Sequence, residues 1–324
     1  MSSMFCYQCE QTAKGEGCTA HGVCGKDPDT ADLQDVLVEV TKGLSQYAHR
    51  AGQLGARDRE LDVFVCEALF TTVTNVNFDP ERVAQWATKG VAKRDRAREL
   101  YEDACRNAGQ TPEEVTGPAQ FDPGDTADDM LKQAEGIRID KRLENLGPDV
   151  TGLQELILYG LKGMAAYADH ARVLGEEDDA VYAYFHEALS YLAGNPQDVD
   201  DLVGMVLRAG EVNLRVMELL DEANTGTYGH PEPTEVRVTP VKGKAILVSG
   251  HDLRDLELLL KQTEGQGINI YTHSEMLPCL AYPELKKYPH LAGNYGGAWH
   301  DQRRAFDPLP SAILLTNNWI HKAT

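Results

Sequence analysis

The sequence predicts an α+α/β protein, in which an N-terminal helical domain with two duplicated helical bundles precedes a Rossmann-like parallel α/β domain. Three observations lead to this fold class. Cysteines crowd a loop at the start of the chain, a helical pattern recurs at a constant offset of 120 residues, and short apolar runs typical of buried strands appear after residue 236. The predicted domains are a cysteine loop at 1–30, a helical domain at 31–235 and an α/β domain at 236–324 that is incomplete at its C-terminus.

The N-terminal loop carries four cysteines, Cys6, Cys9, Cys18 and Cys24. Thiolates are soft ligands, so four of them on a short segment suit either tetrahedral zinc or an iron–sulfur cluster. Structural zinc sites usually arrange their ligands as two tight pairs, whereas here only Cys6 and Cys9 form one. The spacing therefore favours a cluster, with zinc and a disulfide pair as the alternatives. Too few residues precede Cys6 for a signal peptide, so we expect reduced thiols in a cytoplasmic protein.

The composition is that of an ordinary soluble protein. With 324 residues, 42% of them hydrophobic, the chain is long enough to bury a sizeable core. A formal net charge of −20 repels nucleic acid phosphates and anionic lipids, and no local basic patch offsets it. We therefore expect neither nucleic acid nor membrane as a partner. The scattered acidic residues are typical of a solvated surface.

An internal duplication organises the helical region. Residues 33–75 and 153–195 align without a gap, and both copies place apolar residues at helical spacing before a glycine that ends the first helix. Each copy is predicted to be a helical hairpin within a small bundle. The equivalent Tyr47 and Tyr167 are more typical of core aromatics than of functional groups.

A proline-containing segment at 111–127 is predicted to connect the two copies. One more long helix is expected over 202–223. The run from Asn224 to Gly229, with two prolines soon after it, is predicted to break this helix and to mark a domain boundary.

The C-terminal region shows strand patterns instead. Lys244–Ser249 and Ile268–Thr272 are predicted to be parallel strands, joined by an amphipathic helix over Leu253–Glu264. A third strand is expected at Ala312–Thr316, and an edge left exposed there predicts poor solubility of this part.

Ligands of parallel sheets gather beyond the carboxyl ends of the strands. His251 follows the first predicted strand and Glu275 the second, so an imidazole and a carboxylate could share a metal there. A histidine in such a place is more often a capping or hydrogen-bonded polar residue, and this alternative applies to His251, His273 and His290 alike.

Several motifs together resemble the hybrid-cluster protein family, also called prismane proteins or hydroxylamine reductases. The N-terminal motif is Phe5–Glu10 with Cys18 and Cys24, in a closely spaced form. The other similar segments are 220–225, 249–253, 271–278 and 293–297. The resemblance spans essentially the whole chain, and the duplicated helical bundles and the predicted α/β region fit the family's domains.

The resemblance implies that Cys6, Cys9, Cys18 and Cys24 hold a cubane 4Fe–4S cluster. It further implies that His251 and Glu275 ligate a hybrid 4Fe–2O–2S cluster, and it assigns no other catalytic side chain. The implied function in nitrogen metabolism is reduction of hydroxylamine to ammonia and water, and nitric oxide reduction is also attributed to the family. The implied partners are a small N–O substrate and a redox donor such as an NADH-dependent reductase or a ferredoxin.

The sequence departs from the family pattern after the third predicted strand. Trp319 occupies the position where the family has a cysteine ligand, and an indole offers iron no lone pair. The family continues through another α/β domain with further cysteines, so we expect this chain to be truncated and inactive on its own. The alternative function is thus an electron-transfer or metal-binding protein that retains only the N-terminal cubane. A zinc-stabilised structural protein is the weaker option.

The other cysteines are expected to have simpler roles. Cys66 and Cys105 lie in helical patterns as small core residues. Cys279 and His321 are weak candidates to replace the missing ligand.

Overall fold

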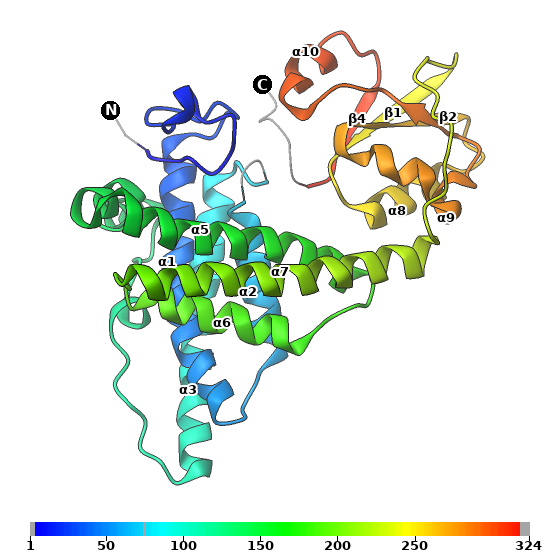
Figure 1. Ribbon diagram of the computed structural model, residues 1–324. Helices are drawn as coiled ribbons and strands as arrows, with labels where there is room; N and C mark the ends of the chain where they lie inside the picture. The colour runs from blue at the N-terminus through cyan, green and yellow to red at the C-terminus, as the bar shows by residue number, and fades with distance from the viewer. Residues whose placement is uncertain (1–3, 74–75, 318–324) are drawn as a thin grey trace. The chain divides into compact units, whose positions relative to one another are not determined.

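The computed structural model describes residues 4–73 and 76–317, which fall into two compact units (Figure 1). The helical unit lies within Met1–Val73, Asn77–Asp169 and Asp178–Met217, and the α/β unit within Thr74–Val76, His170–Glu177 and Glu218–Thr324. The predicted α+α/β fold class is confirmed, because long helices build the first unit and a parallel sheet the second.

Long helices build the helical unit. They are α1 (Pro28–Gln53), α2 (Arg59–Thr71), α3 (Pro80–Ala108), α4 (Ala127–Ala134), α5 (Ile139–Val173), α6 (Asp179–Ala193) and α7 (Val199–Tyr228), with short 3-10 helices η1 (Ala13–Gly15) and η2 (Gly117–Gln120). The last residues of α5 and of α7 belong to the α/β unit. The predicted break at 224–229 is wrong, because α7 continues to Tyr228 and ends only where Gly229 takes φ 82°.

The duplication has matching helix boundaries in both copies. Gly147, at φ 77°, interrupts α5, so its longer second part begins at Pro148. This proline lies 120 residues after Pro28, the first residue of α1. At the other end, Gly55 (φ 80°) and Gly175 (φ 99°) follow α1 and α5 at the same offset. In both copies a proline thus opens the first helix and a left-handed glycine follows its end.

Aspartates cap the next helix in each copy. Asp58 accepts a hydrogen bond from the backbone N–H of Glu60 at 2.9 Å, and Asp178 accepts one from Ala180 at 2.8 Å. Each cap satisfies one of the unpaired N–H groups at a helix start.

The duplication extends to a third helix, which the sequence analysis did not identify. Asp79 accepts from the Arg82 N–H at 3.1 Å at the start of α3, and Asp198 accepts from the Asp201 N–H at 3.0 Å at the start of α7. The structure thus adds a third helix, α3 or α7, to the pair of helices predicted for each copy, α1–α2 or α5–α6.

The two copies make reciprocal polar contacts across their interface. The Cys66 thiol donates to the backbone carbonyl of Ala165 at 3.2 Å. At the equivalent positions of the other copy, His186 Nδ1 lies 3.2 Å from Ser45 Oγ, and the imidazole's other nitrogen lies 2.9 Å from Asp62 Oδ1. All of these side chains are buried, so the contacts join the copies within the core.

The α/β unit is built on one parallel sheet in the order β3-β2-β1-β4. Its strands are β1 (Lys244–Ser249), β2 (Ile268–His273), β3 (Leu291–Asn294) and β4 (Ala312–Leu315). Between β1 and β2 runs α8 (Leu253–Thr263), and shorter helices follow at η3 (Ser274–Ala281), α9 (Pro283–Lys286), η4 (Trp299–Asp301) and α10 (Gln302–Phe306). The strand order reverses at β1, so the topological switch point lies between β1 and β4.

The sequence analysis found β1, α8, β2 and β4 but missed β3. This strand has only four residues and contains Gly293, which weakens a strand signal. A Cβ at Gly293 would lie 2.1 Å from the carbonyl oxygen of Arg237, whose close approach requires glycine. The strand predicted at Ala312–Thr316 is therefore the fourth strand, β4. It lies at the edge of the sheet opposite β3.

The core of the α/β unit joins the sheet to α8. Val248 and Ile270 from the strands pack with Leu256 and Leu260 from the helix. Cys279 is fully buried in the same cluster, which explains it as a packing residue.

Other residues that were predicted to have structural roles are also buried or hydrogen-bonded. Cys66, Cys105 and Tyr47 are buried core residues. His290 is hydrogen-bonded through Nε2 to Thr263 Oγ1 at 3.0 Å, as expected for a satisfied polar residue.

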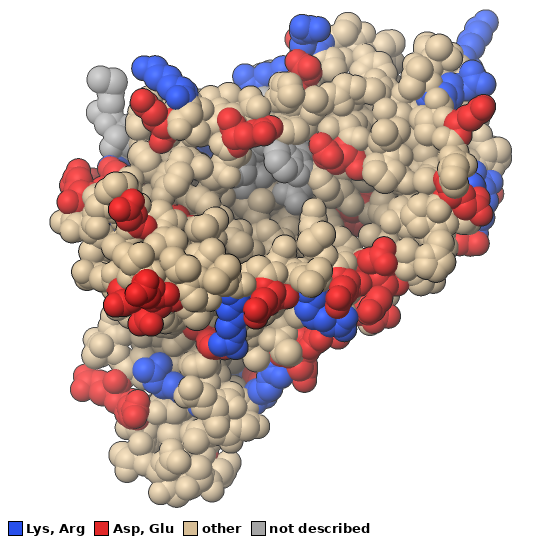
Figure 2. Space-filling model, in the orientation of Figure 1, with Lys and Arg blue, Asp and Glu red and all other residues tan. Residues whose placement is uncertain are grey.

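The surface is acidic but mixed. On the face drawn in Figure 2, Asp and Glu side chains lie in small groups with Lys and Arg among them. Among the described residues, no helix is both long and apolar enough to span a membrane.

Equivalent glycines of the two copies should respond oppositely to a methyl group. At Gly43 a Cβ would lie 2.2 Å from the Pro118 carbonyl oxygen, whereas at Gly163 nothing lies within 4 Å. We expect Gly43→Ala to destabilise the protein by about 1–3 kcal/mol through overpacking. Gly163→Ala should stabilise it by about 0.4–1 kcal/mol, because alanine restricts the unfolded chain.

Urea unfolding of both variants followed by circular dichroism measures the two free energies. Shifts of the same sign would contradict the difference in packing between the copies.

Candidate metal centres

Backbone hydrogen bonds fold the N-terminal loop so that its cysteines share one segment. Cys6 and Cys18 pair as an antiparallel bridge, with N–H to carbonyl distances of 3.1 and 2.8 Å. A second turn encloses Cys24, since the Gly22 N–H donates to the Lys26 carbonyl at 2.8 Å. Cys18 and Cys24 are buried and the other two thiols half-buried. All seven cysteines of the chain have free thiols.

The thiols of this loop influence one another electrostatically. Burial raises the pKa of Cys9, and the neighbouring Cys6, Cys24 and Cys18 raise it further. Burial also raises the pKa of Cys24, against the attraction of Lys26. The four sulfurs therefore lie within electrostatic reach of each other.

Cys18 differs because hydrogen bonds stabilise its thiolate. Burial acts to raise its pKa, but N–H groups of Ala13 and Val23, the Thr12 hydroxyl and the Lys26 charge together lower it. The Ala13 N–H lies 3.5 Å from the sulfur. Hydrogen bonds to sulfur also tune iron–sulfur clusters, so this environment suits a thiolate ligand.

The loop is anchored at the start of α1. Asp27 caps the helix by accepting from the Thr30 N–H at 2.8 Å. Just before it, Lys26 donates through Nζ to the Gln34 side-chain oxygen at 2.6 Å. The first turns of α1 thus fix the end of the segment that carries Cys24.

A second anchor is the packing of Tyr7 on α5. Its ring centroid lies 5.8 Å from that of Tyr159, in an edge-to-face arrangement. Burial, followed by the charge of Glu155, raises the pKa of Tyr7 to about 12. Tyr7 is therefore neutral and packs chiefly as an aromatic group.

Near Tyr159, charged residues of the two copies interact. Asp35 and Lys42 of α1 correspond, at the offset of 120, to Glu155 and Lys162 of α5. Burial raises the pKa of Asp35, although Lys162 acts against the shift. Burial likewise lowers the pKa of Lys162, although Glu155 and Asp35 act to raise it. The loop therefore lies near buried charged groups, and its Met4 and Cys18 also pack with Ala31 of α1 in a small apolar cluster.

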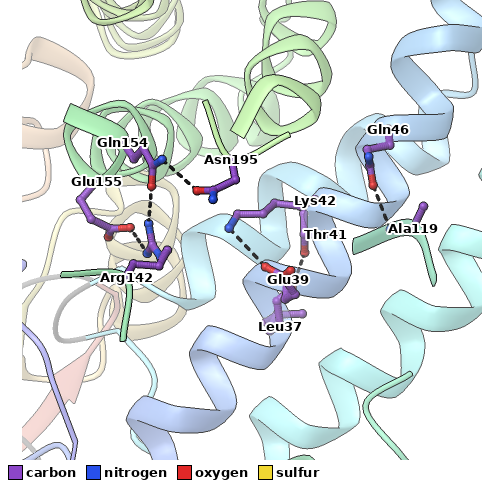
Figure 3. Close-up of polar contacts among 10 residues, drawn as sticks. All are labelled: Leu37, Glu39, Thr41, Lys42, Gln46, Ala119, Arg142, Gln154, Glu155 and Asn195. Carbon is purple, nitrogen blue, oxygen red and sulfur yellow. Dashed lines mark hydrogen bonds and ion pairs between the residues drawn. The ribbon is translucent and has the colours of Figure 1, made fainter. Parts of the chain in front are cut away.

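Arg142 holds together the two parts of the interrupted α5 (Figure 3). Its guanidinium donates to Gln154 Oε1 at 3.1 Å and forms an ion pair with Glu155. The Gln154 amide donates in turn to Asn195 at 3.1 Å. These residues line a cavity of about 170 Å³, where Lys42 pairs with Glu39 at 3.2 Å. The two cations on the wall, Lys42 and Arg142, thus already have acidic partners.

The second candidate centre lies at the carboxyl ends of β1 and β2. Ser249 and His273 are register partners at the last paired position of the two strands. His251 and Glu275 each follow two residues later, beyond the last paired position. The topology thus brings both candidate ligands to the same edge of the sheet, beside the switch point.

His251 lies in an environment that keeps its imidazole neutral. Burial, followed by the nearby His170, lowers its pKa to about 4, and a hydrogen bond to the backbone of Asn317 acts the other way. Neutral imidazole is the form that ligates metals, and a backbone hydrogen bond is a usual way to orient such a ring. The sequence analysis did not identify His170, because the α5 residue lies far from β1 along the chain.

Glycine permits the tight turn that leads to His251. A Cβ at Gly250 would lie 2.0 Å from Thr316 Oγ1, at the end of β4. Glu275, which follows β2, is exposed and is preceded by Ser274 at φ 50°. Trp319 and His321 lie outside the described residues.

His273 packs within the sheet edge instead of extending from it. Its Nδ1 lies 3.1 Å from Ser249 Oγ, and its side chain is fully buried. Among the residues that the structure describes, no three His, Cys, Asp or Glu side chains lie close enough together to hold one metal ion.

Comparison with known proteins gives relatives over nearly the whole chain. A hydroxylamine reductase from Rhodospirillum rubrum is 54% identical over 321 residues, which cover 99% of this chain and 58% of that protein. One from Acidithiobacillus ferrooxidans is 54% identical over 98% of this chain and 58% of its own length. One from Syntrophobacter fumaroxidans is 52% identical with the same coverages. The chain thus spans 58% of the length of these curated relatives.

A solved structure of carbon monoxide dehydrogenase IV from Carboxydothermus hydrogenoformans matches 98% of this chain and 46% of that chain, with a TM-score of 0.34 and 16% identity. A family model described as the Prismane/CO dehydrogenase family matches residues 4–324. With this match and relatives more than half identical, the chain belongs to the Prismane/CO dehydrogenase family.

Proposed function

We propose that the chain serves the reduction of hydroxylamine, NH2OH + 2 e⁻ + 2 H⁺ → NH3 + H2O. The observation that carries this proposal is the 54% identity, over 99% of the chain, to a protein named hydroxylamine reductase. Nitric oxide is a second N–O substrate of the same class. A protein reductase or a ferredoxin would supply the electrons.

Membership of the family implies iron–sulfur clusters. For the first cluster we propose a 4Fe–4S type, held by Cys6, Cys9, Cys18 and Cys24. Such a cluster takes one thiolate on each iron, so its ligands surround a volume instead of meeting at a point. Four thiols spread along one folded loop suit that donor set, and the hydrogen bonds to Cys18 sulfur support it. A cluster bound there supplies one-electron transfer.

For the second cluster we propose His251 and Glu275 as ligands from this chain. Support comes from their shared edge of the sheet and from the low pKa that leaves His251 neutral. A mixed nitrogen, oxygen and sulfur set of the hybrid 4Fe–2O–2S type would accept a small N–O molecule at iron.

The second candidate function is electron transfer alone. Outside the N-terminal loop, Cys66, Cys105 and Cys279 are all buried in cores. No cysteine of the described residues therefore remains to give the second cluster a sulfur ligand. This inventory favours a chain that binds the first cluster but does not reduce hydroxylamine by itself.

Replacing Cys9 by Ser should abolish the first cluster. A hydroxyl is a poor ligand for iron in place of a thiolate, so iron bound per chain should fall by about four, the content of one cubane. Iron analysis after anaerobic purification measures this loss, and circular dichroism should show a folded protein.

Cys105→Ser is the matched control, because this buried thiol lies in α3 outside the loop. Its iron content should equal that of the wild type. Full iron retention by Cys9→Ser would refute the ligand assignment.

Iron and sulfide counts combined with turnover distinguish the two functions. If the second cluster assembles, we expect about eight irons per chain, two sets of EPR signals and ammonia formation from hydroxylamine with reduced methyl viologen as donor. Glu275→Gln should then remove the second signals and the turnover, whereas Glu284→Gln, an exposed glutamate of α9, should change neither.

About four irons, a single set of signals and no ammonia would reject the reductase assignment for this chain. The electron-transfer function would then stand in its place.

A further inference from the structure

Lys26 is buried to an unusual degree for its residue type. Only 2% of the residue is exposed, although lysine is almost never fully buried unless it is paired. Its Nζ donates to the Gln34 side-chain oxygen at 2.6 Å, and the Gln34 amide donates in turn to the Asn77 carbonyl at 3.2 Å. An amide partner orients the ammonium group but carries no charge to offset it.

The charge of Lys26 acts on the thiols of the loop. The residue lies two positions after Cys24, and its carbonyl closes the turn with Gly22. A Cβ placed on Gly22 would lie 3.0 Å from the Lys26 Cβ and 3.2 Å from the Cys24 sulfur, so these two side chains lie next to each other. The Lys26 charge acts on Cys18 as well as on Cys24. The buried cation therefore lies within electrostatic range of two of the four proposed ligands.

Another buried lysine near the loop has a different charge environment. Lys162 of α5 interacts with Cys6, but Glu155 and Asp35 attract it more strongly. Two carboxylates thus offset Lys162, whereas the hydrogen-bond partner of Lys26 is neutral. Lys26 is the lysine whose charge acts on both Cys18 and Cys24.

We propose that Lys26 is a positioning residue that sets the reduction potential of the iron–sulfur cluster in the N-terminal loop. The inference rests on the proposed cluster at the four cysteines. One-electron reduction adds a negative charge to the cluster, and a nearby cation stabilises that charge. Because the cation is shielded from water, the stabilisation is strong and only weakly screened by salt.

The test compares Lys26→Met with Lys14→Met in the full chain. Lys14 lies in η1 of the same loop but is exposed, so water and salt screen its charge. An EPR-monitored redox titration measures the midpoint potential of each variant. Lys26→Met should shift it to a more negative value by about 59 mV, a tenfold change in the one-electron reduction equilibrium. Lys14→Met and the charge-conserving Lys26→Arg should match the wild type.

A second variant leaves the loop itself intact. Gln34→Glu places a carboxylate against the ammonium group, so the potential should again become more negative. Full iron content with an unchanged potential in Lys26→Met would overturn the proposal, and if that variant loses iron, an unchanged potential in Gln34→Glu overturns it. A wild-type chain without iron would instead refute the proposed cluster.

Discussion

The burial of α1 is the constraint on which the helical unit depends. Its first turn is capped by Asp27 and fixes the end of the cysteine loop. Its middle lies against Pro118 at Gly43, and Ser45 reaches His186 in the other copy. A helix surrounded on so many sides leaves little room for side-chain change. Its position determines where the loop lies and how the two copies meet.

The two copies of the duplicated unit share their helix boundaries but differ in the surroundings of their charged residues. The aspartate caps at Asp58 and Asp178 serve the same purpose in both copies. The charged positions differ in their surroundings, since Lys42 faces a cavity with Glu39 while Lys162 is buried near the loop. Equivalent lysines of the two three-helix units therefore have different environments: one lines a cavity, and the other lies near the cysteine loop.

Sequence reasoning recovered what local patterns encode. The repeat, the helix α8 and the strands β1, β2 and β4 all have clear periodicity or apolar runs. It missed β3, where the approach of the Arg237 backbone, not side-chain pattern, selects Gly293. It also missed His170 beside His251 and the Gln34 partner of Lys26, because these contacts join segments far apart or on different turns. Chain folding creates them, and no spacing rule reveals them.

The position of β4 has a consequence for how the α/β unit forms. β1 pairs on one side with β2, and only α8 separates these two strands along the chain. On its other side β1 pairs with β4, which follows only after β3 and α10. Closing so long a loop costs entropy before any pairing compensates for it. We expect β4 to dock late in folding. Until then the central strand of the sheet has an open side, and Ile313 and Leu314, each more than a third exposed even in the folded unit, are available for wrong pairing.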